Sequence, residues 1–262
     1  NDDYENLGDN NQKTIRNHIT EVAGKLFGLY YFDEHYIYES PSNEKLLIDN
    51  DQPAFFKNLC LNFQFPNGTQ KIQTIEERIN DGIKFKPFHF ILSLLSLAQN
   101  NGIVLTKDEI GYYVLNAKQV LQGDISVEEV LGAILKDRAD NTSKKLEAGS
   151  FHTQHIREQF NLLALANLII IEGNNLVINK AEKEIIDVFI SELTKPLQFD
   201  IFKYDLNNDD EKKQMYYDWS AYFGKIAVPN PEILSTSIEA LQREEIEKPK
   251  VAVLGLNPHS GD

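Results

Sequence analysis

Cysteine is nearly absent from this sequence, because Cys60 is the single cysteine among 262 residues. One cysteine cannot form an internal disulfide, and zinc sites built from several cysteines are excluded as well. Its neighbours in the stretch NLCLNF are apolar, which indicates a small buried side chain rather than a nucleophile. The sequence also lacks an apolar run long enough to cross a bilayer. These absences predict a cytoplasmic protein in a reducing compartment, with no membrane partner.

An excess of positive charge is lacking too. The 26 lysines and arginines are outnumbered by 40 aspartates and glutamates, and the net charge is −14. Taken over the whole chain, this balance argues against nucleic acid, because phosphate contacts need positive charge nearby. The acids are unevenly placed, however, and residues 205–211 (DLNNDDE) and 239–247 (EALQREEIE) predict solvated segments or linkers. The total charge therefore does not decide whether one helix face suits DNA.

A helix followed by a β-hairpin is predicted twice along the chain. Residues 13–26 place apolar side chains at helical spacing, and the β-rich runs LYYF and YIYES then flank DEH. Residues 152–165 show the same spacing, and the hairpin LIIIEGNNLVIN and the helix AEKEIIDVFI follow them. The shared order of helix, hairpin and helix indicates a loose internal repeat.

Helices with defined starts are predicted between the two copies. Residues 86–99 (KPFHFILSLLSLAQ) are apolar on most sides and indicate a buried helix. Thr106 with Glu109, and Ser126 with Glu129, are spaced as capping boxes, in which hydroxyl and carboxylate satisfy each other's backbone donors. Helix, capped helix, third helix and two-stranded wing outline a winged helix-turn-helix. In that fold the helix before the wing commonly lies in the DNA major groove.

The predicted fold class is therefore α+β, mainly α, with two winged-helix-like subdomains joined by a helical connector. We expect the first subdomain and connector in residues 1–80 and the second subdomain in residues 81–195. Residues 196–262 are expected to form an acidic linker and the start of a following domain, although the aromatic stretch MYYDWSAYFG within them indicates a helix packed on the second subdomain. Because residue 1 is asparagine rather than methionine, we expect the sequence to begin inside a longer polypeptide.

Several short motifs occur in the order found in one family of enzymes. They are FQFP at residues 63–66, the P-x-x-F-x-L-x-L-L helix at residues 87–95, LTKDEI at residues 105–110, the phrase KDRADN, and the stretch ALANLIIIEGNNLVIN. In this order the sequence resembles, over residues 14–190, the N-terminal recognition region of type IIS restriction endonucleases and their nicking relatives. The resemblance implies a DNA-reading module that contains two winged-helix subdomains.

Cleavage in that family depends on a carboxylate cluster that holds Mg²⁺, with a lysine that helps to position the attacking water. No convincing copy of this cluster occurs in the sequence, so no catalytic residue is assigned and no metal site is expected in this chain. The resemblance implies instead that Mg²⁺ serves an associated cleavage domain or a second subunit. The chain is expected to bind double-stranded DNA without cutting it.

The helices that precede the two hairpins supply the expected DNA contacts. Arginine can bond guanine bidentately, and glutamine can do the same with adenine. An ordinary solvated helix face is the alternative interpretation of these side chains, and Lys136 and Arg138 could either touch phosphates or pair with the neighbouring Asp137 and Asp140. The predicted DNA-binding residues are Gln12, Lys13, Arg16, Asn17, Lys136, Arg138, His152, Thr153, Gln154, His155 and Arg157.

Two other functions stay open at this point. The tail KPKVAVLGLNPHSGD, residues 248–262, resembles a strand and loop of 4-hydroxythreonine-4-phosphate dehydrogenases, which implies an NAD-dependent oxidation in vitamin B6 synthesis. The other signatures of that family are absent from the sequence, and the resemblance leaves residues 1–190 unexplained. Winged helices also serve as protein-interaction modules, and an acidic surface favours that use.

Overall fold

The structure is a computed structural model that describes residues 12, 14–15, 18–144 and 151–225, with the backbone alone for residues 151–156 and 225. None of the described helices combines the length and the apolar content that a membrane span needs. In chain order the elements are η1 (His18–Leu26), β1 (Tyr30–Phe32), β2 (Ile37–Glu39), α3 (Pro41–Asp49), α4 (Gln52–Asn62), α5 (Ile72–Asn80), α6 (Pro87–Asn100), β3 (Leu105–Thr106), α7 (Lys107–Ile110), η2 (Gly111–Leu115), α8 (Lys118–Leu121), α9 (Val127–Ala139), α10 (Phe151–Leu165), β4 (Ile169–Glu172), β5 (Asn175–Ile178), η3 (Lys180–Glu182), α11 (Lys183–Glu192), η4 (Ile201–Lys203) and α12 (Asp209–Lys225).

The first hairpin unit, which we define as η1, β1, β2 and α3, has the predicted order of helix, hairpin and helix. β1 and β2 pair antiparallel with Tyr31 opposite Tyr38, and these two rings stack with their centres 5.0 Å apart. The carboxylate of Asp33 closes the turn, because it accepts backbone hydrogen bonds from His35 and Tyr36 at 2.8 Å each. The hairpin is therefore fixed locally, while η1 is wound as a π-helix rather than as the expected α-helix.

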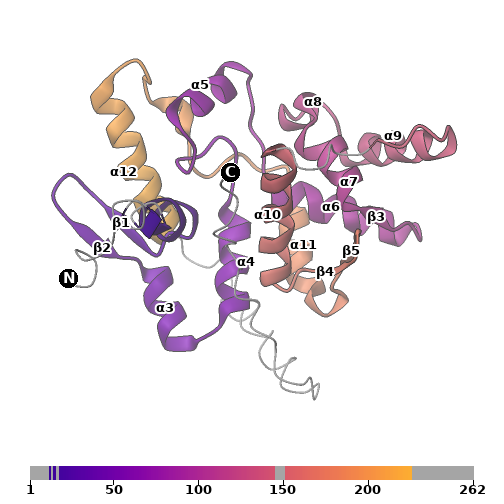
Figure 1. The fold of residues 1–262 in the computed structure, drawn as a ribbon, viewed down its shortest axis with the longest axis horizontal. Helices are drawn as coiled ribbons and strands as arrows, with labels where there is room; N and C mark the ends of the chain where they lie inside the picture. Colours follow the sequence, from indigo (N-terminus) through magenta and orange to yellow (C-terminus); the bar gives the residue numbers. More distant parts are fainter. Residues whose placement is uncertain (1–11, 13, 16–17, 145–150, 226–262) are drawn as a thin grey trace.

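Helix α12 packs on the first hairpin unit, against β1 and α3 (Figure 1). Its buried side chains Met215, Trp219 and Phe223 recur every four residues. A Cβ atom at Gly68 would approach the Trp219 indole to 2.4 Å, so the neighbouring loop lies directly on this ring. The expectation of a linker over residues 196–262 is therefore wrong for the described part of α12, and so is the expectation that this helix packs on the second subdomain. Asp209 and Asp210 at its start are exposed, and the acidic composition of this segment does not reveal the inward spacing of its apolar residues.

The buried helix predicted for residues 86–99 is α6, which forms the centre of the core. Phe88, Ile91 and Leu92 on α6 are completely buried. The helix contacts α4, α9, α11 and β5, so it is covered on most sides, as its apolar sequence predicts. Ahead of it, Phe65 and Phe85 form an antiparallel bridge that ties the segment after α4 to the segment before α6.

The second hairpin unit, which we define as β3, α10, β4, β5 and η3, contains an antiparallel sheet in the order β3-β5-β4. Both predicted capping boxes are present, one at the start of α7 and one at the start of α9. Helices α8 and α9 stand between α7 and α10, so this part of the chain has more helices than a simple winged helix. The mainly helical α+β class is confirmed, whereas the winged-helix identity of both units and the boundaries at residues 80 and 195 stay predictions.

His89 on α6 makes stability depend on pH. It is 1% exposed and packs on the Phe189 ring, and burial lowers its pKa from 6.5 to about 3. Between these two pH values, His89 is protonated in the unfolded chain and neutral in the folded chain. The free energy of unfolding therefore decreases by about 1.4 kcal/mol for each pH unit that the pH falls within this range. We expect His89→Leu to remove this loss, so that the unfolding free energy of the variant gains about 2 kcal/mol on the wild type between pH 6.5 and pH 5. Urea denaturation at both pH values measures the difference, and parallel pH profiles would contradict the prediction.

Candidate nucleic-acid interface

The C-terminal half of α10, the helix predicted to enter DNA, packs into the core. In its C-terminal half, Phe160 and Leu163 are buried. Here α10 packs against α4, β4 and η2, and Figure 1 shows α4 and α10 side by side. Arg157 and Glu158, which come just before this buried stretch, are exposed. The helix is therefore held by its second half, and it presents Arg157 and Glu158 to solvent.

A chain of hydrogen bonds fixes the end of α10. Asn167 follows the helix in the left-handed conformation with a φ of 59°, and its side chain donates to Glu182 Oε1 at 3.0 Å. Asn179, directly after β5, donates from Nδ2 to the carbonyl oxygen of Asn167 at 2.9 Å. Glu182 Oε2 accepts from the Nζ atom of Lys57 in α4 at 2.6 Å. We call these four residues the α4–α10 network, since they join α4, the end of α10 and the base of the β4–β5 hairpin.

The ion pair in this network is removed from water, because the Lys57 side chain is 0% exposed and that of Glu182 is 5% exposed. Burial lowers the pKa of Lys57, and the hydrogen bond to Glu182 opposes that shift. This pair was not predicted from the sequence, although a lysine inside the apolar run FFKNLCLNF indicates that a buried partner exists. The partner lies 125 residues further along the chain, so a single sequence does not identify it.

The predicted contacts of the second repeat lie where α10 begins. The helix starts at Phe151, so His152, Thr153, Gln154 and His155 belong to its first two turns. Their side chains lie outside the described part of the structure. Arg157 is exposed, as a DNA contact must be. The backbone therefore brings these five residues together at one end of one helix, and their role in DNA binding stays a prediction.

The predicted contacts of the first repeat are only partly described. Lys13, Arg16 and Asn17 lie outside the described residues. Gln12 is half-buried and already makes a contact within the protein. The neighbouring hairpin turn carries Asp33 and Glu34, both exposed, and Glu34 pairs with Lys213 at 3.4 Å. DNA contacts by the first repeat stay a prediction.

Arg138 pairs with Glu109 rather than with Asp137 or Asp140, and its role as a phosphate contact stays a prediction. Its guanidinium donates to both carboxylate oxygens of Glu109, at 2.6 and 2.7 Å, and to the carbonyl oxygen of Val104 at 2.8 Å. Burial opposes the charge on Glu109, but the bonds from Arg138 and Thr106 outweigh it and lower the pKa of Glu109. Arg138 thus fastens the end of α9 to the capping box of α7.

Lys136, two residues earlier on α9, is exposed and stays available for a phosphate. The Asp137 carboxylate accepts a short hydrogen bond from the hydroxyl of Tyr113, and this bond lowers the pKa of Asp137. The phosphate contact of Lys136 therefore stays a prediction. The carboxylate of Asp137 is bound to Tyr113 of η2.

The turn of the second hairpin is tied to the protein. Asn174 donates from its side chain to Asp108 at 3.1 Å, and its carbonyl oxygen accepts from the backbone N–H of Lys107 at 2.8 Å. Both partners lie in the first turn of α7. The β4–β5 hairpin is thereby held in place, and Ile170 and Glu172 on β4 are exposed. The hairpin gives α10 a fixed frame, and its turn carries no basic residue.

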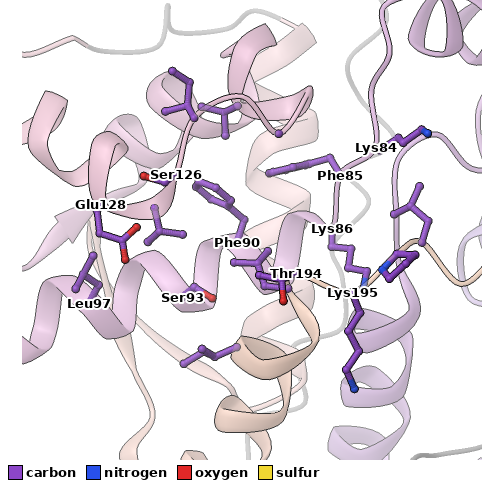
Figure 2. A pocket seen from close by; sticks show the side chains of 18 of the residues that line it. Lys84, Phe85, Lys86, Phe90, Ser93, Leu97, Ser126, Glu128, Thr194 and Lys195 are labelled. Carbon is purple, nitrogen blue, oxygen red and sulfur yellow. The ribbon is translucent and has the colours of Figure 1, made fainter.

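A cleft of about 1100 Å³ lies among α6, α9, α11 and η4, at a separate place from the start of α10. Figure 2 shows Lys84, Lys86 and Lys195 toward one end of it, and Ser126 and Glu128 toward the other. Among the residues that the structure describes, none of the predicted DNA contacts lines this cleft.

The lysines of the cleft are engaged in internal contacts. Lys86 donates to the backbone carbonyl of Glu192 at 2.7 Å, and Lys195 pairs with the carboxylate of the same residue at 2.6 Å. Lys84 lies 4.6 Å from the centre of the Phe202 ring. Acids line the cleft as well, so it presents mixed charge rather than a basic surface. Within the described ranges, no group of three or more His, Cys, Asp or Glu side chains is arranged to hold a metal ion.

Comparison with known families defines the class of this protein. Residues 2–220 match the family model described as the N-terminal part of the restriction endonuclease BpuJI. The match spans well over half of the chain, so the chain belongs to this family of restriction endonuclease N-terminal domains, as the sequence motifs indicated. The dehydrogenase-like tail at residues 248–262 lies beyond the matched range and outside the described residues. Among the curated proteins, none matches the chain.

A solved structure agrees with the family assignment. The chain is similar to the BpuJ1 endonuclease binding domain, whose crystal structure was determined in complex with pyrene- and phenanthrene-modified DNA. The two share 43% sequence identity with a TM-score of 0.79, and the alignment covers 84% of this chain and 80% of the other. The similarity thus extends through most of both chains rather than through one motif.

The structural role of Arg138 can be separated from DNA binding. We expect Arg138→Ala to lower the free energy of unfolding by about 2 kcal/mol, because it leaves the buried carboxylate of Glu109 without its cation. Lys136→Ala removes the same charge from the same helix and should change stability by less than about 0.5 kcal/mol. Urea denaturation of both variants measures this. If Arg138→Ala left stability unchanged and weakened DNA binding, the result would contradict the structural role and assign Arg138 to the DNA interface.

Proposed function

We propose that this chain recognises a specific sequence in double-stranded DNA, as the reading part of a restriction endonuclease. The observation that carries the proposal is the 43% identity, over 84% of the chain, to a domain whose structure was determined on DNA. At this identity the surfaces as well as the fold are expected to be related. Membership in the family of restriction endonuclease N-terminal domains supports the same function.

Helix α10 is the reading element in this proposal. A helix start attracts phosphate through its unpaired backbone N–H groups and the positive end of its dipole. Arg157 is exposed near this start and is suited to bond O6 and N7 of guanine, while Gln154 matches N6 and N7 of adenine. His152, Thr153 and His155 complete the contacts of the first turns. In the first hairpin unit, Lys13, Arg16 and Asn17 are assigned the equivalent role.

Electrostatics limits how such a chain binds DNA. The net charge is −14, and residues 81–195 carry 12 basic against 15 acidic residues. Charges further apart than about 10 Å are largely screened at 0.1 M salt, so attraction must come from cations placed directly on the phosphates. Affinity then depends on a few close contacts, and the slope of its fall with salt is set by the number of phosphates that they neutralise.

Cleavage is assigned in the same proposal to a Mg²⁺-dependent domain or subunit associated with this chain. The family description concerns the N-terminal part of an endonuclease, which supports a division between reading and cutting. Mg²⁺ is the ion that would stabilise the attacking and leaving oxygens of a phosphodiester. A cytoplasmic location belongs to the proposal as well, and the single, buried, unpaired thiol of Cys60 suits a reducing compartment.

Selection from a randomised duplex library, followed by binding measurements at several salt concentrations, tests the proposal. We expect one duplex sequence to be enriched and its affinity to fall linearly with salt on logarithmic axes. Arg157→Ala should weaken binding by about 1–3 kcal/mol, roughly five- to 150-fold, and relax the preference at one base pair.

Lys183→Ala is the matched control, because it removes a lysine from the exposed surface of α11, where it pairs with Asp187. It should change affinity by less than about twofold. The absence of duplex binding even at low salt would contradict the proposal and favour a protein-interaction module.

A further inference from the structure

The α4–α10 network connects the two hairpin units. α4 is attached to the first hairpin unit through Phe27, whose ring makes edge-to-face contacts with Phe55 and Phe56 at 6.3 and 5.7 Å. On its other side, α4 packs against α10 and carries Lys57. α4 therefore lies between the two units, and its contact with α10 is one of the contacts that join them.

A buried ion pair is a costly way to stabilise a fold. Removing the two charges from water costs several kcal/mol for each ion, and apolar residues of similar size often give equal or greater stability. The pair differs from an apolar contact in another respect. A small displacement of two apolar surfaces keeps part of their contact, whereas displacing Lys57 from Glu182 breaks a 2.6 Å ion pair in the interior. The ion pair therefore permits one relative placement of α4 and η3.

The remaining hydrogen bonds extend this placement to the reading helix. The second carboxylate oxygen of Glu182 accepts from Asn167, at the end of α10, at 3.0 Å. Asn179 joins the same point to the end of β5 at 2.9 Å. The position of Lys57 is thereby coupled to the position of α10 and of its hairpin. The charge pair lies outside the surface assigned to DNA, so it acts on binding only through geometry.

We infer that the Lys57–Glu182 pair sets the distance and angle between the two hairpin units, so that both engage one duplex in a single register. Lys57 and Glu182 are positioning residues in this role. The inference rests on the proposed function. One inserted base pair moves a contact by about 3.4 Å along the duplex and turns it by roughly 35°, so a fixed spacing between the units selects one length of DNA site.

The geometry can be tested without DNA in the double variant Lys57→Met/Glu182→Leu. Spin labels on cysteines replacing Lys45 in α3 and Lys183, the residue directly after η3, report the distance between the first unit and the end of the second. Both lysines are exposed, and Cys60 is fully buried. We expect one narrow distance distribution in the wild type. The double variant should stay folded, with a distribution that broadens or shifts. Exchange of the charges in Lys57→Glu/Glu182→Lys should restore a narrow distribution.

Lys118→Met/Asp81→Leu is the matched control, because this pair is equally short at 2.6 Å but its side chains are 59% and 42% exposed. Its distance distribution should equal that of the wild type. An unchanged distribution in the buried double variant would overturn the inference. An unfolded double variant would overturn it as well, because the pair would then serve stability rather than placement.

Binding to DNA supplies the functional measurement. The wild type and the control should bind the selected duplex about tenfold more tightly than the same duplex with one base pair inserted between the segments that the two units protect. The ratio should fall below about threefold in the Lys57→Met/Glu182→Leu variant, and an unchanged ratio would contradict the inference. If the wild type bound no duplex, the proposed function would fail, while the distance measurement would still decide the role of the pair.

Discussion

The contact between α4 and α10 is the constraint on which the arrangement of this molecule depends. α4 contacts the aromatic ring that follows η1 on one side and the predicted reading helix on the other. Beside this contact, Lys57 of α4 and Glu182 of η3 form an ion pair at 2.6 Å that is removed from water. Apolar packing excludes the water and supplies most of the stability. The charge pair restricts the relative position of α4 and η3. The units on either side of α4 therefore behave as parts of one frame.

Within this frame, the second half of α10 is fixed by packing. Phe160 and Leu163 bury its second half, and Asn167 closes it in a conformation that few residues other than glycine adopt easily. Arg157 and Glu158 lie on the side away from the core. A reading helix needs this division, because side chains that bond base edges must be free to enter a groove while their backbone stays fixed. The tethered β4–β5 turn adds to the fixed part.

The sequence predicted what depends on neighbours along the chain. Thr106 with Glu109 marked the start of a helix because a capping box needs only residues three apart, and the hairpins followed from alternating β-rich runs. What it missed depends on distant residues. Arg138 was expected to touch a phosphate or to pair with a neighbouring aspartate, yet its carboxylate partner is Glu109, 29 residues away. Trp219 was expected to be buried, and it is. The sequence did not show that its helix packs on the first hairpin unit, because that choice depends on contacts with distant residues. The side chains at the start of α10 remain predictions, since their targets would lie on another molecule.

The acidic surface contributes to specificity rather than opposing it. Non-specific binding to DNA consists almost wholly of attraction between cations and phosphates, so a net charge of −14 weakens it for every sequence. Bidentate bonds from an arginine or a glutamine to a base edge act over less than 3.5 Å and depend little on distant charge. Acidic residues near the phosphates thus lower the affinity for every sequence, and the bonds to base edges supply a larger share of the binding free energy that remains. Weak non-specific binding also leaves more of the protein free to reach its own site among many competing ones.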